Sequence, residues 1–275
     1  MASIESLLKN AALPNSPTAK LDAELLLAFC LGKSRSYLRT WPEKVPTEAE
    51  ITHFKALLTR RAEGEPVAYL IGKQGFWNLD LDVAPHTLIP RPDTEVLVEA
   101  ALELCAASPR NVLDLGTGTG AIALALASER PAWQVHGVDR VAEAVALAKR
   151  NAEQLKITNA SFSQSTWFSA LTGKRFELIV SNPPYIACDD QHLEQGDVRF
   201  EPLSALVAGT DGLDDLREII QKAPEYLTAQ GWLLLEHGFD QAPVVRTLLE
   251  ARGFLNVHSR TDLGGHERVS IGQYT

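Results

Sequence analysis

Apolar residues in the first third of the chain recur at the three- and four-residue spacing of amphipathic α-helices. Leu21 and Leu25 follow this period, and a second helical stretch begins after Thr47. Thr47 and Glu50 have the spacing of a capping box, in which each side chain satisfies a backbone N–H group at the helix start. Such helices bury their apolar faces against one another. The pattern predicts a small helical domain over residues 1–75.

The pattern changes between Gly64 and Pro92, where short segments rich in β-branched and aromatic residues replace the helical period. Residues 67–72 and 76–81 have this composition, and a cluster of prolines follows them. We expect a β-hairpin here, with residues 76–92 serving as a hairpin and proline-rich linker.

Strand and helix patterns alternate from residue 93 onward. Strands are expected over residues 111–115, 134–139, 176–180 and 232–235, and the last two are continuous apolar runs, typical of strands buried on both faces. Helices are expected over about 120–129 and 141–154. This alternation predicts a parallel sheet with helices on both faces. Two final strands, 255–260 and 268–274, lie too close in sequence for a parallel crossover, so we expect an antiparallel hairpin.

Composition and charge limit the environment and the partners. The 275 residues are 45% hydrophobic with a net charge of −9, and no segment approaches the 18 or so apolar residues of a membrane span. No basic stretch leads into an apolar run after Met1, so we expect no signal peptide, a cytoplasmic location and no membrane contact. The absence of a basic stripe argues against direct nucleic-acid binding. The three cysteines and seven histidines are scattered, so we expect no metal site, and cysteines that are buried.

A glycine-rich loop follows the first strand of the α/β region. It consists of Gly116, Thr117, Gly118, Thr119 and Gly120. Glycines let the backbone approach a ligand closely, and the N-terminus of the following helix offers free N–H groups. Asp139 ends the next strand, 19 positions after Gly120, where a carboxylate can accept hydrogen bonds from both hydroxyls of a ribose.

This loop by itself fits two cofactors. Gly116, Gly118 and Ala121 also satisfy the dinucleotide-binding fingerprint. Asp114 lies just before the first glycine, where a carboxylate suits a ligand with an ammonium and a sulfonium and would repel a pyrophosphate. We therefore expect S-adenosylmethionine as the cofactor.

A second motif, Asn182-Pro183-Pro184-Tyr185, follows a buried run at the carboxyl end of a predicted central strand. Ligands of open α/β sheets bind at this edge. A planar amide nitrogen is a poor nucleophile, because its lone pair is delocalised into the carbonyl group. The Asn182 side-chain oxygen and the Pro183 carbonyl can accept its N–H groups and aim the lone pair at a methyl group, while Tyr185 offers a ring to stack on. The motif predicts methyl transfer to an amide or amine nitrogen, driven by placement.

These two motifs resemble those of class I methyltransferases that modify amide or exocyclic amino nitrogens. Further segments resemble the release factor glutamine methyltransferases, the HemK/PrmC family: residues 89–95, 199–206, 211–213 and 262–268. The resemblance covers essentially the whole chain. It implies a Rossmann-like class I methyltransferase domain over residues 93–275, with a mostly parallel seven-stranded sheet and a C-terminal antiparallel hairpin.

The resemblance also implies residue roles. The glycine loop would hold the methionine part of the cofactor, Asp139 its ribose, and Trp167 would line the pocket. Asn182 would contact both cofactor and substrate, and the Pro-Pro-Tyr sequence after it would contact the substrate glutamine. Arg91 and Glu201 we interpret as structural.

The implied substrate is the glutamine of the Gly-Gly-Gln motif in peptide chain release factors, methylated with release of S-adenosylhomocysteine. The helical domain would help to bind that protein, and the enzyme would act as a monomer. Four alternatives stay open: a glutamine methyltransferase of a large-subunit ribosomal protein, a nucleic-acid adenine methyltransferase, a cofactor-binding module without turnover, and a nicotinamide dehydrogenase. The acidic charge disfavours the second, and the complete Asn182–Tyr185 motif disfavours the third.

Overall fold

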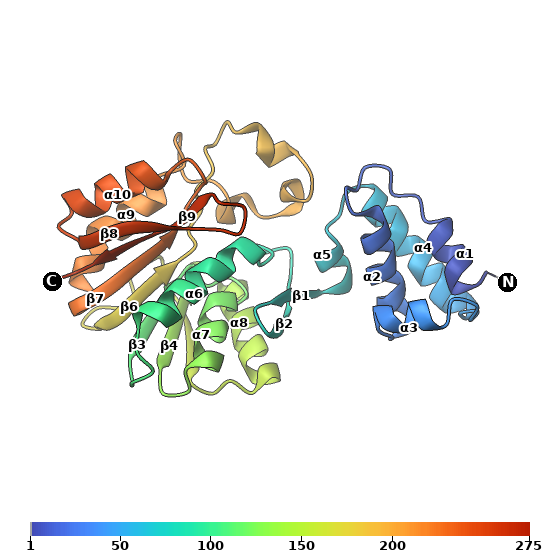
Figure 1. The fold of residues 1–275 in the computed structure, drawn as a ribbon, viewed down its shortest axis with the longest axis horizontal. Helices are drawn as coiled ribbons and strands as arrows, with labels where there is room; N and C mark the ends of the chain where they lie inside the picture. Colours follow the sequence, from blue (N-terminus) through green and yellow to red (C-terminus); the bar gives the residue numbers. More distant parts are fainter. Residues whose placement is uncertain (1) are drawn as a thin grey trace. The chain divides into compact units, whose positions relative to one another are not determined.

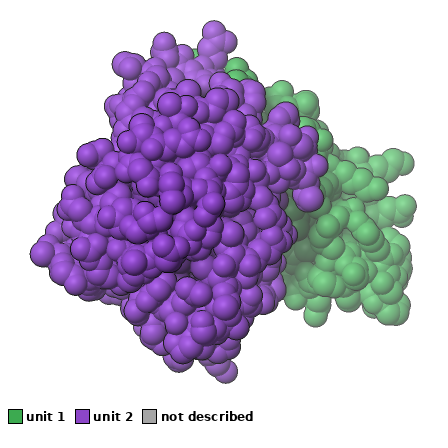
Figure 2. All heavy atoms as spheres, turned by 60° about the vertical axis from the view of Figure 1, so that its left-hand side comes forward, with its two compact units in different colours: residues 1–73, 192–200 green, residues 74–191, 201–275 purple. Residues whose placement is uncertain are grey.

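The computed structural model describes residues 2–275, whose helices and strands are labelled in Figure 1. The chain divides into two compact units (Figure 2). The first contains the chain up to Lys73 together with His192–Phe200, and the second contains Gln74–Gln191 and Glu201–Thr275. A short segment that follows the Asn-Pro-Pro-Tyr motif in sequence therefore belongs to the N-terminal unit.

The first unit is built from helices, as the apolar period predicts. They are α1 (Ile4–Lys9), α2 (Ala19–Leu31), α3 (Arg35–Thr40), α4 (Glu48–Ala62) and α5 (Val67–Ile71). Leu26 and Leu27 of α2 pack with Phe54 of α4 in the core, whereas Leu21 is exposed. The capping box of α4 is confirmed, because Thr47 and Glu50 each accept a hydrogen bond from the other's backbone N–H.

The expected strand over residues 67–72 is wrong, because this stretch forms α5. The helix starts after Pro66 and ends at Gly72, whose left-handed φ of 71° terminates it. Ala68 and Leu70 are buried in the first unit, so packing against the helical core overrides the β-propensity of the segment. The expected hairpin lies slightly later, as β1 (Lys73–Phe76) and β2 (Leu79–Asp82).

The second unit is organised by a seven-stranded sheet in the order β5-β4-β3-β6-β7-β9-β8. Its strands are β3 (Asn111–Leu115), β4 (Gln134–Asp139), β5 (Ala160–Gln164), β6 (Phe176–Ser181), β7 (Leu227–Glu236), β8 (Leu255–Thr261) and β9 (Glu267–Gln273). Strands β3 to β7 pair in parallel, and β9 pairs antiparallel with both β7 and β8. The predicted C-terminal hairpin is confirmed.

Helices cover both faces of this sheet (Figure 1). They are α6 (Glu95–Leu104), α7 (Ala121–Glu129), α8 (Ala142–Leu155), α9 (Asp214–Lys222) and α10 (Ala242–Ala251). Val112 packs in the core that contains α6, α7 and α8, while the next residue, Leu113, packs in the core that contains α9 and α10. Successive strand residues thus meet opposite apolar layers, which explains the continuous apolar runs. The predicted mostly parallel seven-stranded sheet with helices on both faces is confirmed.

Short 3₁₀ turns shape the loops around the sheet: η1 (Pro92–Thr94), η2 (Gln191–Glu194), η3 (Val198–Phe200), η4 (Leu203–Ala205) and η5 (Ala223–Glu225). Within residues 2–275, no helix is long and apolar enough to cross a bilayer. The same part of the chain contains no cluster of three or more His, Cys, Asp or Glu side chains suited to a metal ion. Of the cysteines, Cys105 is buried as expected but Cys188 is exposed.

Candidate active site

The sheet register brings three sequence motifs to one edge. Leu115 at the end of β3 pairs with Val138 of β4 on one side and with Ser181 of β6 on the other. The next residues along the chain are Gly116 at the start of the glycine loop, Asp139 at the end of β4, and Asn182 after β6. Motifs separated by up to 66 positions therefore become neighbours at the carboxyl end of the parallel strands, where open α/β sheets bind their ligands.

The glycine loop depends on backbone conformations that suit glycine. Gly116, Gly118 and Gly120 have φ angles of 72°, 54° and 83°. The backbone N–H groups of Gly116 and Thr117 both donate to the Val138 carbonyl at 2.9 Å, which ties the loop to β4. A Cβ on Gly120 would come within 3.1 Å of Ala148, so a larger residue would also disturb the packing of α8 beneath the loop.

Two carboxyl groups hold this loop by hydrogen bonds. Asp114 is fully buried, and its Oδ2 accepts a 2.6 Å hydrogen bond from Thr117 Oγ1. Burial raises the pKa of Asp114 to about 7, and its Oδ1 has no hydrogen-bond partner within residues 2–275. Asp139 accepts from the backbone N–H groups of Gly118 and Val141, each at 2.9 Å. Asp139 therefore orders the loop, and each of its oxygens keeps a lone pair for a ligand.

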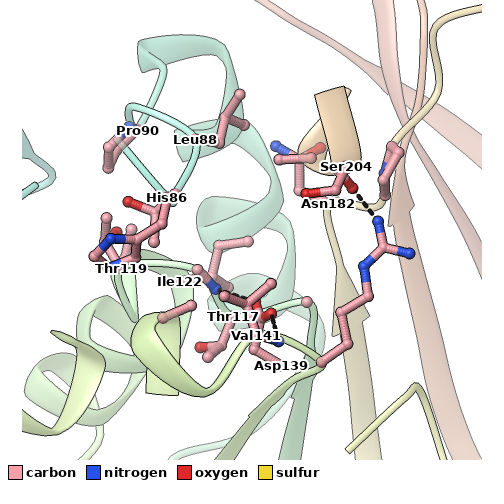
Figure 3. A pocket seen from close by; sticks show the side chains of 18 of the residues that line it. His86, Leu88, Pro90, Thr117, Thr119, Ile122, Asp139, Val141, Asn182 and Ser204 are labelled. Carbon is pink, nitrogen blue, oxygen red and sulfur yellow. Dashed lines mark hydrogen bonds between the residues drawn. The ribbon is translucent and has the colours of Figure 1, made fainter. Parts of the chain in front are cut away.

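A cavity opens above the loop and is shown in Figure 3. Its lining includes four of the five residues of the glycine loop, all but Gly120. Four further predicted site residues also line it: Asp139, Trp167, Asn182 and Pro184. Trp167 is 9% exposed, and its ring lies 3.4 Å from where a Cβ of Gly116 would stand. The ring thus forms a wall directly against the first glycine. Asp114 and Gly120 are not among the lining residues.

The Asn-Pro-Pro-Tyr motif is partly at the cavity and partly behind it. Asn182 donates from Nδ2 to Thr94 Oγ1 at 3.1 Å, and both residues line the cavity. Pro183 and Tyr185 do not line it, and burial raises the pKa of the Tyr185 phenol above its usual value. Gln241 Nε2 donates to the Tyr185 carbonyl at 3.0 Å, which holds the backbone after the two prolines.

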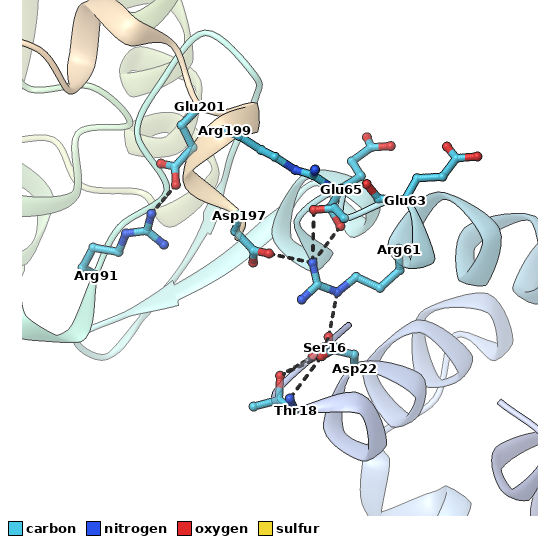
Figure 4. Close-up of polar contacts among 11 residues, drawn as sticks. Ser16, Thr18, Asp22, Arg61, Glu63, Glu65, Arg91, Asp197, Arg199 and Glu201 are labelled. Atoms are coloured by element: carbon cyan, nitrogen blue, oxygen red, sulfur yellow. Dashed lines mark hydrogen bonds and ion pairs between the residues drawn. The ribbon is translucent and has the colours of Figure 1, made fainter. Parts of the chain in front are cut away.

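The interpretation of Arg91 and Glu201 as structural agrees with their contacts (Figure 4). The Glu201 side chain is fully buried, forms an ion pair with Arg91 and accepts from the Ile89 N–H at 3.0 Å. This carboxylate fastens the proline-rich segment after β2 to the chain that follows the Asn-Pro-Pro-Tyr motif. Arg91 also lines the cavity, so the Arg91–Glu201 ion pair forms part of the cavity wall.

Sequence reasoning missed several residues of the cavity. His86, Thr87 and Leu88 form one wall, and Ser204 and Ala205 of η4 form another. The only sequence signal for them is their proximity to the segments 89–95 and 199–206, which resemble the family without revealing a role. Arg140, next to Asp139, hydrogen-bonds the Ser204 carbonyl and so joins β4 to η4.

Comparison with known proteins identifies the family. Residues 2–72 match the model of the PrmC N-terminal domain, and residues 92–197 match the methyltransferase small domain. The chain is 63% identical to the release factor glutamine methyltransferase of Pseudomonas aeruginosa, covering 100% of this chain and 99% of that protein. It is 51% identical to the corresponding protein of Escherichia coli, covering 94% of each.

Solved structures agree on the fold alone. A methyltransferase from Pyrococcus furiosus matches with a TM-score of 0.55 at 17% identity, covering 78% of this chain and 96% of that one. A 16S rRNA methyltransferase from T. thermophilus, in complex with AdoMet and guanosine, matches with a TM-score of 0.54 at 23% identity, covering 74% of this chain and 50% of that one. The chain is therefore an enzyme of the methyltransferase class and belongs to the family of release factor glutamine methyltransferases.

Proposed function

We propose that this enzyme transfers a methyl group from S-adenosylmethionine to the side-chain amide nitrogen of the glutamine in the Gly-Gly-Gln motif of peptide chain release factors. The observation that carries the proposal is the position of Asn182. This residue lines the same cavity as the glycine loop, with its Nδ2 engaged by Thr94. The identity to release factor glutamine methyltransferases, which extends over the full chain, supports the choice of substrate.

The residues present fit the proposed cofactor. Gly116 to Gly120 would hold its methionine part, because the three glycines leave the backbone bare of side chains at the start of α7. Asp139 would bind the ribose hydroxyls with its remaining lone pairs, and the Trp167 ring would pack against the ligand. The buried Asp114 carboxyl lies just before the loop, and the negative charge that it carries once ionised, above about pH 7, favours a cationic ligand.

When bound, S-adenosylmethionine supplies an electrophilic methyl group on a sulfonium. Asn182 Oδ1 and the Pro183 carbonyl would accept the two N–H groups of the substrate amide, which directs its lone pair at that methyl group. The nitrogen–carbon bond would form as the sulfur–carbon bond of the cofactor breaks, with S-adenosylhomocysteine as the leaving group. The methylated nitrogen is acidic and loses its proton to water, so no strong base is needed.

The rate of methyl transfer would come from the placement of the substrate amide against the methyl group. Alignment of two reacting groups corresponds to an effective molarity of about 10⁵–10⁸ M. Pro183 and Pro184 restrict the backbone that carries the accepting carbonyl. Tyr185 would stack its ring on the planar amide, and substrate entry would draw this ring toward the cavity. The helical unit up to Lys73 would bind the body of the release factor, with the enzyme acting as a cytoplasmic monomer that makes no direct contact with nucleic acid.

A direct assay tests the proposal. The enzyme is incubated with purified release factors and S-adenosylmethionine labelled in the methyl group, and modified peptides are mapped by mass spectrometry. We expect one methyl group, on the glutamine of the Gly-Gly-Gln motif. Label confined to a large-subunit ribosomal protein, or to adenine in nucleic acid, would replace the proposal with the corresponding alternative.

A further inference from the structure

A buried carboxyl group lies directly behind the acceptor motif. Glu236 is the last residue of β7 and is 1% exposed. Ser181 pairs with Leu235 in the parallel register of β6 and β7, so the residues that follow, Asn182 and Glu236, emerge side by side at the sheet edge. Within residues 2–275, Glu236 Oε2 has no hydrogen-bond partner. A buried carboxyl oxygen without a partner is costly, which indicates that this carboxyl is kept for a purpose other than stability.

Thr94 connects Glu236 to Asn182. Thr94 is buried, and its Oγ1 accepts the hydrogen bond from Asn182 Nδ2 at 3.1 Å. Both Thr94 and Asn182 also hydrogen-bond the Glu236 carboxyl. Thr94 precedes α6 but forms no side-chain cap with it, so its hydroxyl is not needed to start the helix. The three side chains form one polar cluster beside the cavity, in which Glu236 Oε2 is left without a partner within residues 2–275.

The donors and acceptors of this cluster have only one consistent arrangement when Glu236 is ionised. A carboxylate can only accept, so the Thr94 hydroxyl donates to Glu236 and uses a lone pair for Asn182. The Asn182 group that faces the cluster must then be its NH₂. Turning the amide over would place its oxygen against the carboxylate, which is electrostatically unfavourable.

We propose that Glu236 is a positioning residue that, directly and through Thr94, fixes the Asn182 side-chain amide with Oδ1 facing the acceptor nitrogen. Its catalytic consequence rests on the function proposed above. Oδ1 would be free to accept a substrate N–H only because the NH₂ group is held away from the cavity. If the Asn182 amide were turned the other way, its NH₂ group would face the N–H of the substrate amide. Two donors cannot hydrogen-bond each other, so the substrate would be misaligned.

The positioning of the Asn182 amide should depend on pH through the charge state of Glu236. Burial raises the pKa of Glu236 to about 7, and the nearby Asp93 of η1 also raises it. Hydrogen bonds from Thr94 and Asn182 and the charge of Arg268 on β9 act in the opposite direction. Tyr185 also faces this carboxyl, but its raised pKa keeps it neutral. Below neutral pH the protonated carboxyl can itself donate, and the direction of the Asn182 amide is no longer dictated.

Kinetics of three variants test the proposal in the full-length enzyme. Thr94→Val removes the hydroxyl at nearly constant shape, Thr94→Ser keeps it, and Glu236→Gln keeps the shape but removes the charge. We expect Thr94→Val and Glu236→Gln to lower kcat about tenfold or more, with KM for both substrates changed by less than about twofold. Thr94→Ser, which keeps the hydroxyl, should retain most of the kcat of the natural enzyme. We expect kcat of the natural enzyme to decline below about pH 7, and we expect no such decline in Glu236→Gln. A Thr94→Val variant whose kcat equals that of the natural enzyme would overturn the proposal.

A second measurement follows the environment of the Asn182 side-chain amide in the absence of catalysis. The side-chain NH₂ resonance of Asn182 is followed by NMR in the substrate-free enzyme and assigned by its loss in Asn182→Asp. It should shift with a midpoint near pH 7 in the natural protein and stay constant in Glu236→Gln. The Asn159 amide, whose Nδ2 donates to three backbone carbonyls, is the internal control and should not move.

The two measurements separate the possible failures. An Asn182 resonance that ignores pH in the natural protein would refute the role of Glu236, whatever the substrate. An enzyme that fails to methylate release factors but shows the expected resonance shift would refute the proposed function and leave the positioning of Asn182 supported.

Discussion

Arg61 and Asp197 are 136 positions apart in the chain, yet Arg61 Nη1 donates to Asp197 Oδ1 at 2.7 Å (Figure 4). The same guanidinium donates from Nε to Asp22 Oδ2 at 2.7 Å. Arg199 adds a hydrogen bond to the Glu63 carbonyl. The segment His192–Phe200, which follows the acceptor motif, is thus held to the helical unit by one buried arginine and one backbone contact.

Removal of this arginine should destabilise the helical unit. Arg61→Leu leaves the buried Asp22 without its cation, and the expected loss in the free energy of unfolding is about 3–5 kcal/mol. Asp197→Ala removes a partly exposed partner, and its expected loss is below about 1 kcal/mol. Urea unfolding of both variants provides the comparison. Equal effects would mean that Arg61 contributes mainly through its contact with the 192–200 segment.

Deletion of the helical unit should separate cofactor binding from substrate binding. The second unit has its own apolar cores on both faces of the sheet, so we expect it to fold without residues 1–73. The truncated enzyme should bind S-adenosylmethionine but fail to methylate an intact release factor. Circular dichroism controls for folding, and calorimetric titration measures binding. Full-rate methylation by the folded fragment would assign the helical unit another purpose.

Asp139→Ala should weaken cofactor binding. The substitution removes the proposed bonds to the ribose, each worth roughly 1.5–3 kcal/mol, and also releases the Gly118 N–H from its 2.9 Å bond. Asp139→Asn keeps one acceptor oxygen and should fall between alanine and the natural residue. Calorimetric titration with S-adenosylmethionine ranks them, with the exposed Asp80→Ala as the matched control. An unchanged dissociation constant in Asp139→Ala would move the ribose contact elsewhere.

Asn182→Ala should slow methyl transfer at least about a hundredfold, a few kcal/mol of barrier, because the acceptor that aligns the substrate nitrogen is lost. The loss should appear in kcat more than in KM. Asn182→Asp keeps an oxygen of similar placement but brings a second negative charge beside Glu236, so an intermediate rate is expected. Single-turnover methylation of a purified release factor measures both. A near-normal rate in the alanine variant would remove the proposed alignment mechanism.

The stability of the protein should depend on pH through Asp114. Burial raises its pKa from 3.8 to about 7, so between these values the folded state holds a proton that the unfolded state has released. Its contribution is therefore fully present at low pH and is lost as pH rises through about 7. In Asp114→Asn this loss is absent, so the stability of the variant relative to the natural protein should increase with pH, by at most about 1.4 kcal/mol per unit. Urea unfolding across this range checks the sign.

Local patterns determined the parts of the fold that depend on neighbouring residues. The runs 176–180 in β6 and 232–235 in β7 were predictable because they are buried on both faces and therefore largely apolar. Strands β3 and β4 were predictable from the alternation of strand and helix patterns. The edge strand β5 was not predicted, because only Phe162 within it is buried and its sequence has no such run. The glycine loop and the Asn-Pro-Pro-Tyr motif were visible because their chemistry requires rare residue types at fixed spacing.

Tertiary structure decided whatever depends on contact between distant segments. The sequence 67–72 has β-rich composition, but burial of Ala68 and Leu70 in the helical core makes it a helix. The orientation of the Asn182 amide depends on Thr94, 88 positions earlier, and on Glu236 in a neighbouring strand. No periodicity or motif encodes such pairings, because register and crossover topology arise only when the whole sheet assembles. Residue types indicated methyl transfer to nitrogen, and the folded chain decided which of those residues lie around one cavity.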